Sequence, residues 1–156
     1  MTLTFRETPI GRIAIEGSGD WITRLFLPKN CPEDGNCQEL PLPVVEEAFR
    51  QLGLYLEGRL RDFSLALKPD GTPFMKRVWE NVLEVPYGET RSYREIASSA
   101  GNPRAVRAVG MANARNPIPI FIPCHRIVGA DGRLVGYGGG VELKARLLEL
   151  EASHRP

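Results

Sequence analysis

Proline, glycine and charged residues interrupt every apolar run of this chain, which restricts it to short helices and strands. No run approaches the ~20 consecutive apolar residues that a membrane-spanning helix needs. Residues 1–5 lack the basic segment and the long apolar core of a signal peptide. We therefore expect a cytoplasmic protein whose 156 residues form one compact domain or two small domains that share an interface.

The first part of the chain has the pattern of a small α/β domain. Ile13 and Ile15 alternate with polar neighbours after a proline–glycine turn, which is typical of a half-buried strand. Two further strands are predicted at residues 21–27 and 63–67. Between them, apolar residues recur at helical spacing over residues 43–57, which predicts an amphipathic helix.

A turn signal at Asp70–Gly71 separates this part from a second part with well-marked helix ends. We accordingly predict one domain over residues 1–71 and another over residues 72–156. Thr72–Pro73 combines an N-cap residue with proline at the first helical position, so a helix should begin there. A final helix is predicted over residues 141–152.

Two short helices joined by a tight turn predict a helix-turn-helix in the middle of the second part. Ser92 and Glu95 have the spacing of a capping box, and the helix that they begin should stop at Gly101. Asn102–Pro103 is expected to cap the second helix, which should run to about Ala114.

Basic residues are concentrated in the second part of the chain. Residues 1–72 hold 8 Lys and Arg against 11 Asp and Glu, whereas residues 73–156 hold 12 against 8. The stretch between residues 96 and 130 contains no acid and four arginines, which are Arg104, Arg107, Arg115 and Arg126. This distribution fits contacts to phosphates and also fits an ordinary solvated basic face.

The second helix of the predicted pair combines arginines with very small side chains. Arg104, Arg107, Met111 and Arg115 recur at spacings of three and four and should share one face. Most of the other residues are alanine or glycine, so the helix backbone can approach another surface closely. The pattern fits two such surfaces equally, a nucleic acid or a neighbouring helix.

Three cysteines are too few for a disulfide framework, and an odd number cannot all be paired. Cys31 and Cys37 lie in a stretch rich in proline, glycine and asparagine, with five residues between them, so they do not form a C-x-x-C pair. The two histidines, His125 and His154, lie far from this stretch, and a zinc site there would lack ligands. We expect reduced loop cysteines and no metal.

The third cysteine has the setting of a nucleophile. The apolar run Ile120–Ile122 is bounded by prolines, which predicts a buried, strand-like segment that places Cys124 beside His125. A free thiol has a pKa of ~8.5 and is mostly protonated at neutral pH. Attack on carbon needs an ionised and reachable sulfur, and a neighbouring imidazole can accept the proton. The same two residues are also compatible with an inert core cysteine beside a structural histidine.

The motifs around Cys124 resemble those of one family. Residues 123–127, Pro-Cys-His-Arg-Ile, are similar to the P-C-H-R-V active-site signature of the O6-alkylguanine-DNA alkyltransferases, also called methylated-DNA–protein-cysteine methyltransferases, with Ile127 in place of the usual valine. Further motifs of that family follow in order at residues 86–93, 101–110, 116–117, 137–140 and 147–151. The resemblance covers roughly residues 74–151, whereas the first 70 residues resemble the family only in length and strand content.

The resemblance implies the chemistry of the site. Cys124 would accept the alkyl group, and His125 would take its proton through a bridging water. Glu151 would orient His125, as the carboxylate of a catalytic triad does. Asn116 would tie the helix-turn-helix to the cysteine-bearing segment.

The resemblance also implies how DNA is held. Tyr93 would turn the phosphate and donate to the base, while Arg107 would enter the duplex where the damaged nucleotide is flipped out. Tyr137 and Gly138 would line the pocket for the base. Two further residues are candidates for phosphate contacts, namely Arg104 and Arg115.

The implied fold is α+β, with a small ribonuclease-H-like α/β domain followed by a helical, winged-helix-like domain that carries the active site. The implied partner is double-stranded DNA containing O6-alkylguanine, bound through the minor groove by a monomer that associates with the nucleoid. No cofactor is expected, and each molecule would act once. Many relatives carry serine at the position of Gly138, so one contact to the base is absent here, and a glycine-rich wall over residues 138–140 would admit alkyl groups larger than methyl.

Three other functions fit parts of the pattern. A non-catalytic lesion-binding protein would keep the DNA-binding parts, but such proteins replace the cysteine that this chain has at position 124. A cysteine–histidine hydrolase would leave the helix-turn-helix and its arginines without a role. A helix-turn-helix regulator should prefer particular DNA sequences.

Overall fold

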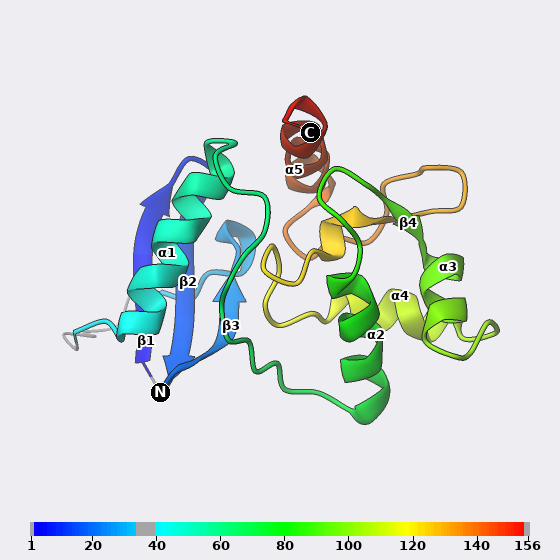
Figure 1. The fold of residues 1–156 in the computed structure, drawn as a ribbon, viewed down its shortest axis with the longest axis horizontal. Coiled ribbons are helices and arrows are strands. Elements are labelled where there is room, and N and C mark those ends of the chain that lie inside the picture. The colour runs from blue at the N-terminus through cyan, green and yellow to red at the C-terminus, as the bar shows by residue number, and fades with distance from the viewer. Residues whose placement is uncertain (1, 34–39, 155–156) are drawn as a thin grey trace.

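The computed structural model describes residues 2–33 and 40–154, which fold into two halves. In Figure 1 the N-terminal sheet and its helix lie on one side, the helices of the C-terminal half lie on the other, and the last helix stands between them. Cys37 lies outside the described residues, so its predicted state is not tested. Within the described ranges, no helix is long and apolar enough to cross a membrane.

Three antiparallel strands form the N-terminal sheet in the order β1–β2–β3. The strands are β1 (Thr2–Thr8), β2 (Gly11–Ser18) and β3 (Trp21–Phe26). The strands predicted around Ile13 and over residues 21–27 are confirmed. β1, which pairs with β2 along its whole length, is a further strand of the β-rich first part.

Helix α1 (Pro43–Leu56) covers the sheet and confirms the helix predicted over residues 43–57. The middle strand of the sheet is buried at three consecutive positions, Ile13, Ala14 and Ile15. Successive side chains of a strand point to opposite faces, so both faces of the sheet are covered at this point. One apolar core therefore runs from α1 through the sheet and on into the C-terminal half.

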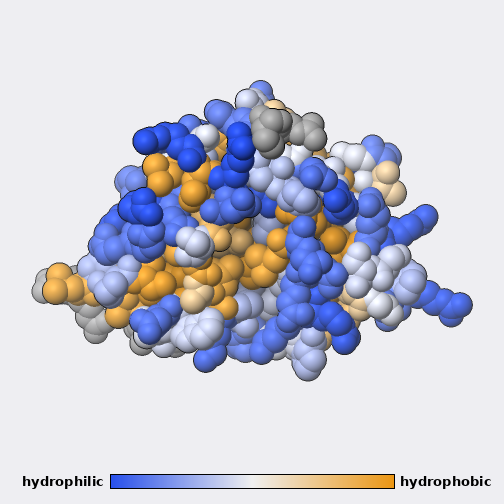
Figure 2. All heavy atoms as spheres, viewed as in Figure 1, coloured by the Kyte–Doolittle hydropathy of each residue, from blue (hydrophilic) through white to orange (hydrophobic). Residues whose placement is uncertain are grey.

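The segment after α1 is extended, but it is not the strand predicted over residues 63–67. Only Leu67 forms a bridge, which is parallel to Ile22 of β3. The N–H of Ile22 donates to the carbonyl of Ala66, and the N–H of Lys68 donates to the carbonyl of Ile22, both at 2.8 Å. Half-buried and exposed side chains alternate over residues 63–67, as they do in a strand, but only the end of the segment reaches the edge of the sheet. Figure 2 shows hydrophobic atoms gathered on this face of the molecule, over α1 and the segment that follows it.

The C-terminal half is helical, with one pair of short parallel strands. Its helices are α2 (Pro73–Leu83), α3 (Tyr93–Ser99), α4 (Val106–Ala114) and α5 (Val141–Ser153). Its strands are β4 (Arg91–Ser92) and β5 (Ile127–Val128). The final helix predicted over residues 141–152 is confirmed as α5.

The predicted starts of α2 and α3 are confirmed by their caps. Thr72 Oγ1 accepts a hydrogen bond from the N–H of Met75 at 3.1 Å, and Ser92 and Glu95 form both bonds of the capping box. After α3 the chain turns at Gly101, whose φ of 86° is a left-handed conformation that suits glycine.

Helix α4 begins later than the predicted cap at Asn102–Pro103. The chain first makes a turn, closed by a 3.0 Å hydrogen bond from the N–H of Ala105 to the carbonyl of Asn102, and the helix starts at Val106. An asparagine–proline pair favours the start of a turn as well as the start of a helix, and here it serves the turn. α3 and α4 nevertheless pack against each other as the predicted helix pair.

The segment before Cys124 is buried as predicted, but it is a tight turn and not strand-like. The N–H of Ile122 donates to the carbonyl of Ile118 at 2.9 Å across the turn. Ile120, in the middle, has a φ of 73°, which is rare for a β-branched residue and costs about 1–3 kcal/mol. Close packing sustains this strain, because the side chain of Ile120 is 1% exposed.

Candidate active site

The turn places Cys124 at the start of a short 3₁₀ helix, η2 (Cys124–Arg126). The side chain of Asn116 holds the turn, because it donates to the carbonyl of Ile122 and accepts from the N–H of Ile118, both at 2.9 Å. From α4, the amide of Asn113 donates to the carbonyl of Cys124 at 3.2 Å. The position of the sulfur is therefore fixed relative to the second helix of the helix-turn-helix.

The thiol of Cys124 is buried and keeps its proton in the resting protein. Burial raises the pKa of Cys124 to about 11, although a hydrogen bond with Asn116 and the positive charge of Lys144 act in the opposite direction. Burial therefore opposes the ionised sulfur that attack on carbon needs. Attack on carbon requires a base that removes the proton at the moment of reaction.

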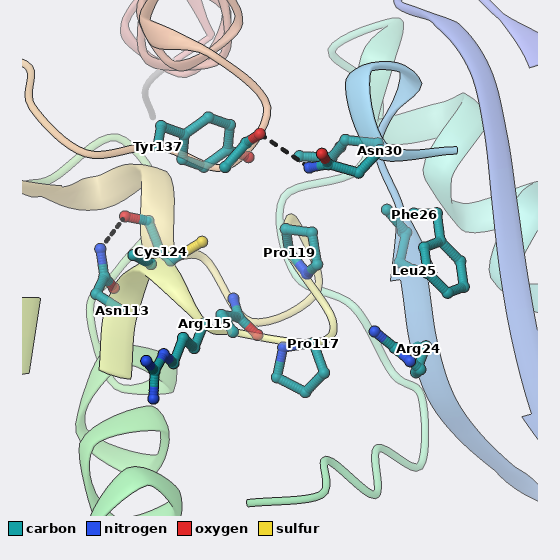
Figure 3. Close-up of a pocket in the computed structure, with 14 residues that line it drawn as sticks. Arg24, Leu25, Phe26, Asn30, Asn113, Arg115, Pro117, Pro119, Cys124 and Tyr137 are labelled. Atoms are coloured by element: carbon teal, nitrogen blue, oxygen red, sulfur yellow. Dashed lines mark hydrogen bonds between the residues drawn. The ribbon is translucent and has the colours of Figure 1, made fainter. Parts of the chain in front are cut away.

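The sulfur lies at a cavity of about 280 Å³ where the two halves of the chain meet. Figure 3 shows the sulfur pointing into this space, with Tyr137 and Asn30 above it in the view. β3 and the short 3₁₀ helix η1 (Pro28–Asn30) form one wall, while residues 113–119 and the loop before α5 form the others. Asn30 Nδ2 donates to the carbonyl of Gly138 at 2.9 Å, so the N-terminal half closes one side of the cavity.

Of the glycines at 138–140, only Gly138 lines the cavity. A Cβ atom at Gly138 would meet only ordinary contacts, the nearest 3.8 Å away, whereas one at Gly139 would come within 2.6 Å of Leu27 Cδ1. Gly139 is therefore required for close packing against the N-terminal half. The open wall predicted for residues 138–140 is confined to Gly138.

His125 and Glu151 form a buried pair next to Cys124. The distance from His125 Nε2 to Glu151 Oε2 is 2.6 Å, and the two side chains are 0% and 1% exposed. This bond assigns the ring proton to Nε2 and leaves Nδ1, which has no hydrogen-bond partner among the described residues, as the acceptor. Burial lowers the pKa of His125, so the imidazole is neutral and able to accept a proton.

Glu151 is held as an ion by donors on several sides. Arg126 donates from Nε to Oε1 at 2.8 Å and from Nη2 to Oε2 at 3.1 Å, and the N–H of Gly88 donates to Oε1 at 3.0 Å. Burial by itself raises the pKa of Glu151, but the hydrogen bonds and charges of His125 and Arg126 outweigh it and hold the pKa at about 2. Arg126 is thus a buried partner of this carboxylate, and its expected place on a basic phosphate-binding face is corrected.

Tyr93, the first residue of α3, is half-buried and belongs to a second polar group near the cavity. Its hydroxyl donates to the carbonyl of Val135 at 2.9 Å, and Lys144 Nζ donates to the same carbonyl at 3.0 Å. Lys144 Nζ also lies 3.4 Å from the hydroxyl of Tyr93. Lys144 is fully buried, and burial lowers its pKa.

The three arginines predicted to contact DNA are all exposed, but only one of them lines the cavity. Arg115 is the C-cap residue of α4 and lies at the cavity mouth. Arg107 projects from the first turn of α4, and Arg104 lies in the preceding turn. Because α4 begins at Val106, Arg104 does not share the helical face predicted for it.

Three residues at the site, Lys144, Tyr55 and Asn113, were not predicted from the sequence. Lys144 precedes Glu151 by seven residues, which is two helical turns, so a search for polar residues on the buried face of α5 would have found it. Tyr55 of α1 contacts His125 across 70 residues of sequence, and no local pattern signals such a pair. Asn113 lies in the α4 segment, but no role was assigned to it.

A metal site is not formed by the described part of the chain. Across residues 2–33 and 40–154, no group of three or more His, Cys, Asp or Glu side chains is placed to hold a metal ion. Cys31 is half-buried just after η1, and its N–H approaches the carbonyl of Pro28 at 3.4 Å.

Two family models match the chain. Residues 1–69 match the ribonuclease-like domain of 6-O-methylguanine DNA methyltransferases, and residues 73–153 match the DNA-binding domain of the same proteins. The chain thus combines a ribonuclease-like domain with a helical DNA-binding domain, and the fold class that the resemblance implied is confirmed.

Relatives match over nearly the whole length of the chain. The methylated-DNA–protein-cysteine methyltransferase of Methanosarcina barkeri is 47% identical over 154 residues, which cover 95% of each chain. The constitutive one of Bacillus subtilis is 46% identical and covers 95% of this chain and 93% of its own. A structure of Mycobacterium tuberculosis OGT in complex with DNA has a TM-score of 0.86 at 45% identity, covering 97% of this chain and 93% of that one. The chain therefore belongs to the 6-O-methylguanine DNA methyltransferase family.

Proposed function

We propose that this chain repairs DNA by transferring an alkyl group from the O6 atom of guanine to the sulfur of Cys124. Repair of O6-methylguanine by transfer to a cysteine of the protein is the activity of the family to which it belongs. One observation carries the choice of Cys124: its sulfur lies at the cavity between the two halves, directly beside a histidine that a buried carboxylate holds.

In this proposal His125 is the base. Its Nδ1 is the acceptor that the bond to Glu151 leaves available, and a water molecule would carry the proton from the thiol to it. Glu151 remains ionised at neutral pH and stabilises the imidazolium as it forms. The raised thiol pKa keeps the sulfur unreactive toward other electrophiles until a substrate is in place.

The transfer conserves atoms without any co-reactant. A bond forms between the sulfur and the alkyl carbon, while the bond between that carbon and O6 of guanine breaks. The proton that left the thiol balances the one that the guanine base takes up as the bond breaks, and the base stays in the DNA strand as ordinary guanine. The sulfur ends as a thioether that no group of the site can cleave, so each molecule acts once.

The damaged base would reach the cavity only after its nucleotide has been flipped out of the duplex. The loss of base stacking costs a few kcal/mol. Arg107, which is exposed on the first turn of α4, would fill the gap in the duplex. The small residues of α4 permit close approach in the minor groove, with Arg104 and Arg115 on phosphates. Tyr93, Tyr137 and Gly138 would hold the flipped base.

The chain would act as a monomer on lesion-bearing duplex DNA in the cytoplasm, associated with the nucleoid. The boundary between its two domains would lie after residue 71, which falls between the two ranges matched by the family models. A non-catalytic lesion binder is the alternative, and the presence of Cys124 at the cavity argues against it.

Mass spectrometry tests the proposal directly. After incubation with an oligonucleotide duplex that contains O6-methylguanine, the peptide with Cys124 should gain one methyl group, and peptides with Cys31 or Cys37 should not. The matched variant Cys124→Ser should gain none while it binds the same duplex with similar affinity. Binding without any methyl gain in the unaltered protein would mean that it recognises lesions without repairing them.

A further inference from the structure

The hydroxyl of Tyr55 enters the pair of His125 and Glu151 from the N-terminal half of the chain. Tyr55 lies in the last turn of α1 and is fully buried. Its O–H donates to Oε2 of Glu151 at 2.6 Å, and its oxygen is 3.3 Å from Nε2 of His125. Oε2 is also the atom that His125 contacts at 2.6 Å, so the two side chains share one carboxylate oxygen.

Aromatic contacts fix the ring of Tyr55 and connect it to the cysteine-bearing turn. The ring centroid lies 5.2 Å from that of Phe63 and 6.1 Å from that of Tyr87, which meets it edge-on. Phe63 packs edge-on against Phe121, at 4.7 Å, three residues before Cys124. The cluster that joins the two halves therefore also sets the position of the Tyr55 hydroxyl relative to the reacting site.

The hydroxyl of Tyr55 is a permanent donor. Burial raises its pKa far above the ordinary value, and the charge of Glu151 raises it further, so the O–H is never lost in the working range of pH. A hydrogen bond to an ionised carboxylate stabilises the charge on the oxygen that accepts it. The same bond weakens the attraction that this oxygen exerts on a protonated neighbour, here the imidazolium of His125.

We propose that Tyr55 is a positioning residue for alkyl transfer, which holds Oε2 of Glu151 against His125 and limits how strongly that carboxylate favours the protonated imidazole. This inference rests on the role of His125 as base in the function proposed above. It places part of the control of the base in the N-terminal half, on a helix that carries none of the residues of the family's cysteine motif.

The charged and titratable groups around His125 come from every element packed against it. They are Glu151 and Lys144 of α5, Arg126 and Cys124 of η2, Tyr55 of α1, and Tyr87 in the segment before β4. Burial lowers the pKa of His125, Glu151 raises it, and Arg126 and Lys144 lower it. Removing the Tyr55 hydroxyl changes none of these charges. It acts through the carboxylate oxygen that Tyr55 shares with His125 and through the direct 3.3 Å contact of the hydroxyl with Nε2.

Tyr55→Phe removes the hydroxyl and keeps the ring. Tyr87→Phe is a matched control, because the Tyr87 hydroxyl is buried in the same cluster and has no hydrogen-bond partner among the described residues. The rate of a single methyl transfer is measured for both variants and the unaltered protein across pH. Tyr55→Phe should slow transfer at neutral pH by about 10-fold, since it removes one hydrogen bond to a charged group. The acid limb of the pH profile, where the rate falls because His125 becomes protonated, should move to higher pH in Tyr55→Phe. In Tyr87→Phe it should stay in place.

A second variant keeps the packing intact and tests the opposite direction. A fluorinated tyrosine at position 55 is a stronger donor to Glu151, so it should move the acid limb to lower pH. The imidazole titration of His125, followed by NMR in protein without DNA, should move in the same directions as the limb in each variant. If Tyr55→Phe and Tyr87→Phe give equal rates, equal limbs and equal His125 titrations, the inference is wrong even though transfer occurs. If the unaltered protein transfers nothing, the proposed function fails, and the NMR titration still decides whether Tyr55 acts on His125.

Discussion

Replacing Glu151 by glutamine removes one negative charge from the site and keeps the shape of the side chain. In the folded protein the pKa of this carboxyl is held at about 2, against a value of 4.5 for a free glutamate. That difference corresponds to about 3 kcal/mol of stability at neutral pH. Leaving Arg126 buried without its counter-charge gives the same order, about 3–5 kcal/mol. We therefore expect Glu151→Gln to destabilise the fold by about 3 kcal/mol.

The dependence on pH has a definite sign. Because folding lowers the pKa of Glu151, its contribution is complete above pH 4.5 and is lost as the pH falls toward 2. The unaltered protein should lose stability over this interval. Glu151→Gln, which lacks the contribution at every pH, should show a flatter profile.

Thermal melting followed by circular dichroism measures the effect. A loss of about 3 kcal/mol lowers the Tm of a chain of this size by roughly 6–12 °C. Glu149→Gln is the matched control, since it makes the same chemical change on the same helix at an exposed position. If the two variants melt within about 2 °C of each other at pH 7, Glu151 does not hold the buried network together in the way described.

Three further changes separate the parts of the proposal. Arg107→Ala should slow repair more in duplex than in single-stranded DNA, and equal slowing in both would mean that Arg107 does not assist flipping. Asn116→Ala removes two hydrogen bonds from the cysteine-bearing turn, so urea titration should show a loss of about 1–3 kcal/mol. If the variant is as stable as the unaltered protein, the turn does not depend on these two hydrogen bonds. Gly138→Ser should leave the Tm within about 2 °C, because its Cβ would have only ordinary contacts. In the unaltered protein, which has Gly138, transfer of a benzyl group from benzylated guanine should be detectable as a mass gain on Cys124. If methyl transfer is fast and no benzyl transfer is detected, the cavity wall at Gly138 does not admit the larger group.

Helix starts could be predicted where the deciding contacts are local. Thr72, Ser92 and Glu95 form their cap bonds with residues three positions away, so the sequence contains both partners. The start of α4 could not be predicted in the same way, because Asn102–Pro103 suits a turn as well as a cap. The geometry of the turn at Ile120 was also beyond prediction, since apolar composition signals burial and not the conformation of the backbone.

The site shows the same limit. The adjacency of Cys124 and His125 suggested a reactive pair, and the family's motifs then pointed to Glu151 as its third member. The raised pKa of the thiol was not foreseen, because it depends on how completely the fold removes water from the sulfur. Tyr55 meets Glu151 across 96 residues, and only the packing of the two halves brings them together.

The hydrogen bond between Asn30 and the carbonyl of Gly138 has a consequence for engineering. A chimera that takes its N-terminal half from a relative would keep the nucleophile and its base, yet it would receive a new lining at β3 and η1. The range of alkyl groups that such a hybrid removes should therefore match that of the relative that supplied the N-terminal sheet. This should hold even though the reacting cysteine comes from the other parent.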